Sequence, residues 1–374
     1  MTGMGSRPKP DHDRPAGVVH ILPYDLARGA QRYARALVDA LAAEGERHQI
    51  LTLFRAEPVL LRPDVELDVP MGPLRRIGLD PRAVLRLRRE VKRLRPAVVV
   101  AHGGESAKYA ALALPRNVPL VYLKIGTAHR ALQRRANKSL HGFYTRRADV
   151  VAAVSSDVAD EAHRLYEVPR DRLVVIPNAR DPVDFPPRSP GQNDPPRLIF
   201  VGHLDPGKRP DWFIDVVAEL RGAGKEFQAV MVGDGPLQGS LRSRAEVAGV
   251  EMLGRRGDVP ELLAGSDIFV FTSLPPGEGM PGVLIEAGLA GLATVSTRVP
   301  GARDVIDDGV TGLLVDVEDK AGMTSAVGRL VDEEETREAM GKGAWDRCLE
   351  MFSLQASVDR WHQVLGPLMR LDRV

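Results

Sequence analysis

The sequence predicts an α/β protein built from two doubly wound domains that face a cleft. The chain has 374 residues, more than one hydrophobic core usually serves. Short apolar runs rich in β-branched residues alternate with amphipathic helical patterns, which is typical of parallel sheets covered by helices. A proline-rich stretch divides this alternation into two sets. Ligands bind such sheets at the carboxyl ends of the strands, so we expect the functional site in the cleft.

The first alternating set occupies residues 17–178, which we expect to form one Rossmann-like domain. Its predicted strands lie near residues 17–22, 49–54, 97–101, 120–125, 150–154 and 173–176, and its clearest helices near 31–43 and 81–94. Residues 1–16 lack the apolar core of a signal peptide and are interpreted as a disordered tail. The spacing of Asp11 and Asp13 imitates a metal-binding motif, but its place in this tail favours coincidence.

The second alternating set occupies residues 197–352 and predicts a second Rossmann-like domain. It follows a linker at 179–196, because the run from 177 to 196 contains seven prolines, too many for a regular element. Strands are predicted near 198–201, 228–232, 250–253, 268–272 and 293–297, and helices near 210–221, 237–248 and 282–291. Residues 353–374 predict a final helix that packs back toward the first domain.

Composition and charge limit the possible functions. The chain is 44% hydrophobic and 27% charged, and it has no apolar run that would cross a bilayer. Its single cysteine, Cys348, fits a reducing cytoplasm. Residues 1–190 contain 32 Lys and Arg against 21 Asp and Glu, a balance of +11, whereas residues 191–374 contain 19 against 29, a balance of −10. The two parts therefore contact different partners, or each other. We expect the protein to bind no nucleic acid, metal ion or cofactor.

The most informative stretch carries two carboxylates eight residues apart, Glu278 and Glu286. Pro281 suits the first position of a helix, and the apolar pattern that follows predicts a helix buried nearly all round. A buried carboxylate needs strong hydrogen bonds, so Glu286 either pairs with a basic side chain, caps a backbone turn or accepts from the hydroxyls of a ligand. The glycines before the helix and its free amides suit a phosphate.

The motifs resemble a known family when they are taken together. "EGMPGVLIEAGLAGLATVST", "GARDVIDDGVTGLLV", "VGHLDPGKRPDWFIDVV", "MVGDGPLQGSLRSRAE", "MLGRRGDVPELLAGSDIFVFTS" and "VVIPNARDPVDF" resemble the retaining nucleotide-sugar glycosyltransferases of the GT-B fold, family 4 type, also called glycosyl transferases group 1. The resemblance implies transfer of a sugar from a nucleotide diphosphate sugar, the co-substrate, to a hydroxyl acceptor. Polysaccharide, glycolipid or other glycoconjugate biosynthesis is the implied setting.

The resemblance also implies roles for particular residues. Lys208 would stabilise the departing diphosphate and Glu278 would bind sugar hydroxyls, so these two are the implied catalytic residues. Glu286 would accept from the ribose hydroxyls. The implied donor-binding set is Gly29, His203, Lys208, Arg209, Gly254, Arg255, Glu278, Gly279, Met280, Pro281 and Glu286, with the base against Gly254 and Arg255.

The chain departs from the family pattern at several places. His203 stands where an arginine is usual, and Arg209 is a possible substitute. Ile125 stands where a histidine is common, which leaves His129 and His102 as candidates on the acceptor side. The nucleotide, the sugar and the acceptor stay open.

Further alternatives remain at this stage. The arginine-rich helix near 81–94 is either a core-facing stripe with a solvated back or a contact for an anionic membrane or a lipid-linked acceptor, which would make the protein peripheral to the membrane. "VGDGPLQG" imitates a dinucleotide fingerprint and would suggest an NADP-dependent oxidoreductase, with Arg255 on the phosphate. A non-catalytic GT-B binding module is the other alternative.

Overall fold

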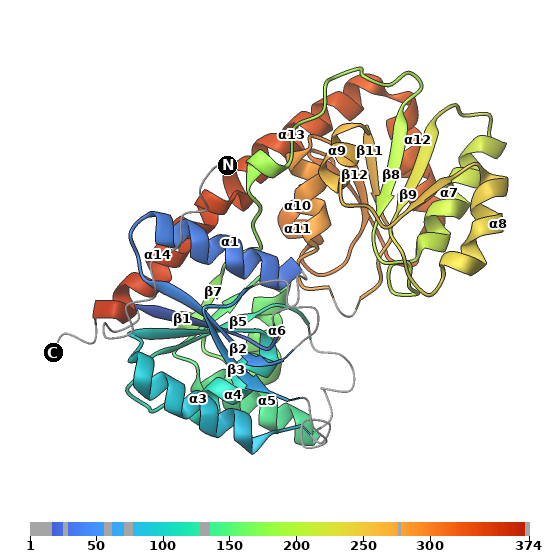
Figure 1. The fold of residues 1–374 in the computed structure, drawn as a ribbon. Helices are drawn as coiled ribbons and strands as arrows, with labels where there is room; N and C mark the ends of the chain where they lie inside the picture. Colours follow the sequence, from blue (N-terminus) through green and yellow to red (C-terminus); the bar gives the residue numbers. More distant parts are fainter. Residues whose placement is uncertain are drawn as a thin grey trace, which may run out of the picture. The chain divides into compact units, whose positions relative to one another are not determined.

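The computed structural model describes residues 17–24, 29–55, 62–70, 78–127, 135–275 and 278–370 (Figure 1). Residue contacts divide the chain into two compact units. The first unit comprises Met1–Leu123, Phe143–Val151 and His362–Val374, and the second comprises Lys124–Gly142 and Ala152–Trp361. The predicted tail at 1–16 lies outside the described residues.

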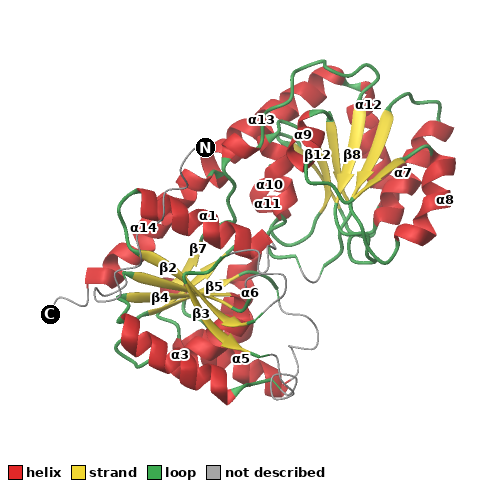
Figure 2. Ribbon diagram, in the orientation of Figure 1, coloured by secondary structure: helices red, strands yellow, loops and turns green. Residues whose placement is uncertain are grey.

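The first sheet has seven strands in the order β3-β2-β1-β4-β5-β6-β7. β1 pairs in parallel with β2 and β4, and parallel pairing continues to β3 and β5. The strands are β1 (Val18–Leu22), β2 (His48–Phe54), β3 (Val65–Val69), β4 (Val98–His102), β5 (Leu120–Lys124), β6 (Val150–Ala153) and β7 (Leu173–Val175). The helices are α1 (Gly29–Ala43), α3 (Pro81–Leu94), α4 (Gly103–Ala113), α5 (Arg135–Arg147) and α6 (Ser156–Tyr166). Figure 2 shows α1 on one face of this sheet and α3 on the other.

Helix α3 illustrates how local sequence sets the bounds of an element. Asp80 accepts a hydrogen bond from the amide of Arg82, Pro81 takes the first helical position, and Arg95 ends the helix in the left-handed conformation. The predicted range of 81–94 is therefore confirmed. The sequence predicts an apolar stripe of Val84, Leu87, Val91 and Leu94. The buried residues are Ala83, Leu87, Val91 and Leu94, and Val84 is only partly buried.

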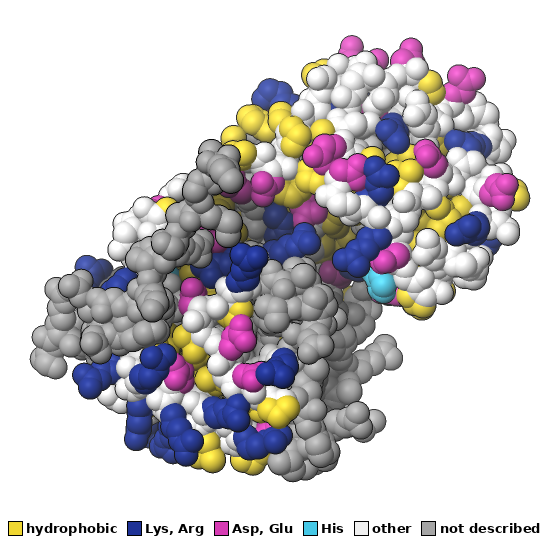
Figure 3. Space-filling model, in the orientation of Figure 1, with side chains coloured by type: hydrophobic (Ala, Val, Ile, Leu, Met, Phe, Trp, Pro, Cys, Tyr) yellow, Lys and Arg dark blue, Asp and Glu magenta, His cyan; other side chains and the backbone are white. Residues whose placement is uncertain are grey.

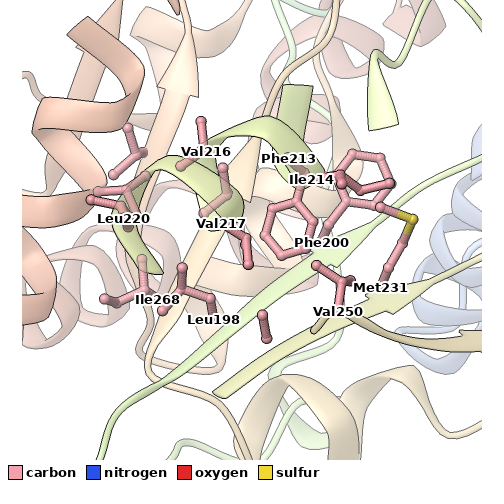
Figure 4. Packing of buried hydrophobic residues seen from close by; sticks show 14 of the residues in the cluster. Leu198, Phe200, Phe213, Ile214, Val216, Val217, Leu220, Met231, Val250 and Ile268 are labelled. Atoms are coloured by element: carbon pink, nitrogen blue, oxygen red, sulfur yellow. The ribbon is translucent and has the colours of Figure 1, made fainter. Parts of the chain in front are cut away.

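The second sheet has six strands, all in parallel pairs, in the order β10-β9-β8-β11-β12-β13. They are β8 (Arg197–Val201), β9 (Gln228–Val232), β10 (Glu251–Gly254), β11 (Ile268–Phe271), β12 (Ala293–Thr297) and β13 (Gly312–Val315). The helices are α7 (Pro210–Gly222), α8 (Gln238–Ala248), α9 (Val259–Ala264), α10 (Gly282–Leu289), α11 (Ala302–Val305), α12 (Lys320–Asp332), α13 (Glu334–Phe352) and α14 (Leu354–Arg370). Figure 4 shows α7 packed on β8 and β9 through Phe200, Phe213 and Val217.

The predicted fold class is confirmed, because both sheets have the 3-2-1-4-5-6 winding of doubly wound domains. Every strand predicted from the sequence is present, and each observed end lies within one residue of the predicted end. Strands β3 and β13 were not predicted. The predicted linker contains a short 3₁₀ turn, Pro182–Asp184, and is anchored by buried Arg188, which binds Asp267 at 2.5 Å and Glu338 at 2.8 Å. The domain boundaries stay a prediction.

Candidate active site

Two residues predicted from the sequence meet at the carboxyl ends of neighbouring strands. Lys208 lies in the loop after β8, and Glu278 lies in the loop after β11, which pairs with β8. The ammonium group of Lys208 forms an ion pair with Oε1 of Glu278. Both side chains are partly exposed, at 30% and 15%, so a ligand has access to the pair.

The loop that carries Lys208 is held by its own turn. Oδ1 of Asp205 accepts from the amides of Gly207, at 2.7 Å, and Lys208, at 3.1 Å. The hydroxyl of Thr272, directly after β11, lies 2.8 Å from the carbonyl oxygen of Lys208. The Lys208 ammonium also lies 5.6 Å from the centre of the Phe271 ring. These contacts fix the lysine at the strand ends without occupying its ammonium fully.

The loop that carries Glu278 is fastened through its carbonyl oxygens. Thr127 donates to the carbonyl of Glu278 at 3.3 Å, Ser155 to that of Gly279 at 2.7 Å, and Asn178 to that of Met280 at 3.0 Å. These three donors follow β5, β6 and β7, and all belong to the second unit. Within the described ranges, no partner is found for the amides of Gly279 and Met280. The loop therefore offers N–H groups, with the N-terminus of α10 beside them, to an anionic ligand.

Glycine is required where this loop passes the strand ends. A Cβ on Gly279 would overlap the carbonyl oxygen of Ile125, and a Cβ on Gly301, whose φ is 77°, would overlap the carbonyl oxygen of Gly279. Ile125, which stands where the family often has a histidine, thus packs its backbone against the loop. Gly279 therefore allows close approach of the protein's own backbone, and the predicted approach of a ligand to this loop stays a prediction.

A buried ion pair supports the end of β5. The ammonium of Lys124 donates to Oε1 of Glu161 at 2.6 Å and to the carbonyl oxygen of Gly126 at 2.7 Å. Burial lowers the pKa of Lys124, and the neighbouring Glu161 carboxylate opposes that change. The pair holds the backbone at 125–126 against Gly279.

Glu286 is paired with a basic side chain. Nε of Arg180 donates to its Oε1 at 2.7 Å, and the two side chains are 19% and 20% exposed. The helix is therefore less enclosed at Glu286 than the sequence suggested, although Leu284, Ile285 and Ala287 are buried. The Arg180 guanidinium lies over Gly282, where a Cβ would overlap it. Oε2 of Glu286 has no hydrogen-bond partner among the described residues, so the ribose role stays a prediction.

The other predicted donor residues lie in different surroundings. His203 is exposed, with Nδ1 3.6 Å from Oδ1 of Asp234. The guanidinium of Arg209 is instead bonded to the carbonyl oxygen of Val317 and to Glu318, and it stacks 4.1 Å from the Trp212 ring centre. Arg209 is therefore committed away from Glu278 in this structure. Its substitute role stays a prediction.

The remaining predicted residues are placed as follows. Gly254 ends β10 with a φ of 67°, and Arg255 after it is exposed. Pro281 caps α10, directly after Met280. Gly29 begins α1, and His102 ends β4, both in the first unit. His129 lies outside the described residues.

The first two glycines of "VGDGPLQG", Gly233 and Gly235, pack against protein backbone, whereas a Cβ on the third, Gly239, would meet nothing within 4 Å. Gly233 has a φ of 141°, and a Cβ there would overlap the carbonyl oxygen of Gly202. Gly235 has a φ of 158°, and a Cβ there would lie 2.5 Å from the carbonyl oxygen of Leu204. These glycines fit β9 to the loop after β8, which explains the motif without a dinucleotide.

Comparisons with known proteins match both halves of the chain to glycosyltransferase families. The family model for glycosyl transferases group 1 matches residues 195–333, and that for Glycosyltransferase Family 4 matches residues 27–183. N-acetyl-alpha-D-glucosaminyl L-malate synthase of Bacillus anthracis is 28% identical over 243 residues, spanning 62% of this chain but only 63% of that protein. D-inositol 3-phosphate glycosyltransferase of Arthrobacter is 27% identical over 389 residues, spanning 90% of this chain and 91% of that protein.

Solved structures give the same fold. Anabaena Alr3699/HepE, solved in complex with UDP, superposes with a TM-score of 0.80 at 19% identity, covering 94% of this chain and all of that one. The chain therefore belongs to the family 4 glycosyltransferases of the GT-B fold. It is a nucleotide-sugar-dependent glycosyltransferase of glycoconjugate biosynthesis, which overturns the oxidoreductase and non-catalytic alternatives.

Sequence reasoning missed the residues that hold the site together. Asn178 and Arg180 both lie in the quoted motif "VVIPNARDPVDF", but no role was predicted for either. Ser155 and Thr127 carry no motif that would single them out. Their only sequence signal is a position just after a strand, where parallel sheets place functional side chains.

Proposed function

We propose that the protein transfers a sugar from a UDP-sugar to a hydroxyl acceptor, with retention of configuration at the anomeric carbon. The Lys208–Glu278 ion pair beside the unpartnered amides of Gly279 and Met280 is the observation that carries this proposal. Transfer builds negative charge on the departing diphosphate, and an ammonium group with fixed N–H donors stabilises that charge.

Donor binding would exchange the partners of the ion pair. The Lys208 ammonium would turn from Glu278 to the diphosphate, and the freed carboxylate would accept from hydroxyls of the sugar. Oε2 of Glu286 would accept from the ribose, while Arg180 keeps Oε1. The base would lie against the backbone at Gly254. Because the paired side chains neutralise each other before the donor arrives, neither charge needs another partner in the unliganded protein.

The choice of UDP follows from the fold neighbour that was solved with UDP. A thermal-shift screen with UDP, GDP and ADP tests it, because a ligand at one hundred times its dissociation constant stabilises by about 2.7 kcal/mol. The matching UDP-sugar should then release UDP slowly without an acceptor. Stabilisation by GDP or ADP alone would refute the UDP assignment, and binding without any release of nucleotide would refute the transferase reaction.

The acceptor is proposed to be presented at an anionic membrane, as part of a lipid-linked molecule. Figure 3 shows Lys and Arg gathered on the face where Figure 1 places α3. Arg88 and Arg89 on this helix are exposed and make no ion pair within the described residues. Leu85 beside them is 56% exposed, which supplies an apolar group for the lipid boundary. No described helix is long and apolar enough to cross a membrane, so this contact would be peripheral.

Liposome binding tests the membrane contact. The wild-type protein should bind vesicles only when they contain acidic lipid, and binding should weaken sharply with salt. Arg88→Glu with Arg89→Glu should abolish binding. A variant with Arg242→Glu and Lys342→Glu changes the net charge equally at exposed positions of α8 and α13 and should still bind. Equal binding to neutral and acidic vesicles, or an equal loss of vesicle binding in both variants, would refute the membrane contact and leave α3 as an ordinary solvent-exposed helix.

A further inference from the structure

A row of buried histidines crosses the first sheet. Nε2 of His102 lies 2.9 Å from Nδ1 of His20, and Nε2 of His20 lies 2.9 Å from Nδ1 of His48. Nε2 of His48 lies 2.8 Å from Oε2 of Glu46. His20 and His102 are 0% and 1% exposed, whereas the Glu46 side chain is 30% exposed. One end of the row is therefore near solvent and the other is enclosed.

The strand register explains why the three imidazoles are in line. His20 on β1 is opposite Ile50 on β2 and Val100 on β4. His48 precedes Ile50 by two residues, and His102 follows Val100 by two, so all three side chains are on one face of the sheet. Ala34 and Val38 of α1 pack with Ile50, so this is the face that α1 covers. The row runs from the amino end of β2 to the carboxyl end of β4.

Hydrogen-bond arithmetic gives the row a direction. Burial lowers the pKa of His102 to about 3 and lowers those of His20 and His48 from their usual value, so at neutral pH each imidazole is neutral, with one N–H and one lone pair. The Glu46 carboxylate only accepts, so Nε2 of His48 donates to it. Nδ1 of His48 must then accept from His20, and Nδ1 of His20 must accept from His102. Each ring is thereby set as its Nε2–H tautomer, and Nδ1 of His102 keeps a bare lone pair.

The far end of the row has two buried polar atoms without partners. Nδ1 of His102 and Oγ of Ser106 have no hydrogen-bond partner within the described residues, and Ser106 is 0% exposed. They lie at the first turn of α4, separated by Gly103, Gly104 and Glu105, and a Cβ on Gly104 would lie 3.3 Å from the hydroxyl of Tyr144 and 3.4 Å from that of Tyr122. Leaving such atoms unpaired costs free energy, and an arriving hydroxyl group would recover it.

We propose that Glu46, acting through His48 and His20, holds His102 as its Nε2–H tautomer so that Nδ1 accepts a hydrogen bond from a hydroxyl of the acceptor substrate. His102 is then the residue that recognises the acceptor, and Glu46 is a remote positioning residue. The proposal rests on the transferase function proposed above. Among the described residues, the charged and titratable groups near the row include Arg35 on α1, Glu44, and His362 on α14, whose Nε2 is 3.3 Å from Oε1 of Glu46.

The tautomers can be read by NMR of protein labelled with ¹⁵N-histidine, because protonated and bare ring nitrogens resonate apart. In the wild type, His20, His48 and His102 should all be Nε2–H. Glu46→Lys replaces an acceptor with a group that only donates, so it should invert all three tautomers. Glu44→Lys makes the same charge change beside His362 without contacting His48, and it should invert none.

Other outcomes of this measurement count against the relay, by which we mean the setting of the His102 tautomer by Glu46 through His48 and His20. An Nδ1–H signal for His102 in the wild type would overturn it, as would an inverted His48 with an unchanged His102 in Glu46→Lys. If Glu46→Lys does not fold, Glu46→Gln serves instead. Its amide offers either an acceptor or a donor, so it should give a mixture of tautomers where the wild type gives one.

The recognition step has its own readout. Methyl α-D-glucoside, a probe for a sugar hydroxyl acceptor, should shift the His102 Nδ1 signal saturably in the wild type and much less in Glu46→Lys. Used as acceptor, it should show a KM raised roughly 5- to 10-fold in Glu46→Lys, the scale of one hydrogen bond, with UDP affinity unchanged. No shift of the Nδ1 signal would overturn the recognition. Absence of turnover with every UDP-sugar would instead refute the transferase function. The NMR measurement of the three tautomers would still test the effect of Glu46 on His102, because it does not depend on turnover.

Discussion

Replacing Glu286 by glutamine separates the two tasks that the structure gives this carboxylate. Oε1 accepts from Arg180 at 2.7 Å, and Oε2 is proposed to accept from the ribose. The substitution keeps the shape of the side chain and removes its charge. The unliganded protein should lose stability, because the guanidinium of Arg180 loses its ionic partner. Nucleotide affinity should fall as well, because an amide is a weaker acceptor than a carboxylate.

The structure sets the size of both effects. Hydrogen bonds to charged groups contribute about 1.5 to 3 kcal/mol when enclosed. The pair is only one-fifth exposed, so it is screened less than a surface pair, and we expect a stability loss of about 1 to 2 kcal/mol. That corresponds to a few degrees in Tm, since 1 kcal/mol shifts Tm by about 2–4 °C in a unit of 150–250 residues. The affinity for UDP should fall by roughly 10- to 100-fold.

Arg180→Met provides the matched variant. It keeps an apolar stem over Gly282 and removes the guanidinium, so it should destabilise the unliganded protein while leaving UDP affinity largely unchanged. In the double variant the stability losses should be less than additive, because both changes remove one interaction. Tm and calorimetric UDP titrations on the same samples supply both quantities. If Glu286→Gln binds UDP as tightly as the wild type does, Glu286 serves only the ion pair and the ribose assignment is refuted.

Four further results are expected. Lys208→Ala should lower kcat by roughly 10²- to 10³-fold, the scale of one fixed electrostatic donor, and a variant that keeps more than half of its turnover would exclude the lysine from the mechanism. Gly279→Ala should abolish activity, because its Cβ would overlap the Ile125 carbonyl oxygen, whereas Gly239→Ala, which meets nothing within 4 Å, should be as active as wild type. Burial raises the pKa of Cys348 to about 12, so iodoacetamide at pH 8 should label it only after unfolding; rapid labelling of the folded protein would contradict its burial. Burial lowers the pKa of His102 to about 3, so as the pH decreases toward 5 the unfolded state binds a proton that the folded state does not. The free energy of unfolding should therefore decrease by about 2 kcal/mol when the pH is lowered from 7 to 5. Urea titrations should show this decrease in the wild type and a smaller one in His102→Gln.

The sequence predicts the fold well because its strands are buried on both faces. Such strands appear as continuous apolar runs, and β9 and β12 were predicted with their observed ends. β3 was missed because Glu66 and Asp68 interrupt its apolar residues, as suits an edge strand. β13 was missed because only three apolar residues follow Gly312. A strand with few or interrupted apolar residues has no clear hydrophobic pattern and cannot be predicted from periodicity.

The site is predicted in part, and the reason is topological. Lys208 and Glu278 follow strands that pair with each other, so the expected winding of the second sheet already brings them together. Arg180 is on a proline-rich segment with no period, so nothing in the sequence predicts that it reaches Glu286. The histidine row needed the strand register, because His20 and His48 are isolated histidines in apolar strands until Ile50 and Val100 are aligned with β1.

The fastening of the 278–280 loop bears on how the backbone of this transferase could stabilise a diphosphate. A backbone N–H stabilises developing charge well only if it already points at the charge, because turning it during the reaction costs free energy. Each peptide unit is planar, so fixing its carbonyl oxygen also fixes the N–H of the next residue on the opposite side. The side chains of Thr127 and Ser155 bind the carbonyls of Glu278 and Gly279, and the next amides in the chain are those of Gly279 and Met280. The donors that hold the loop therefore lie on one side of it, and the amides proposed to meet the diphosphate are oriented by the same bonds.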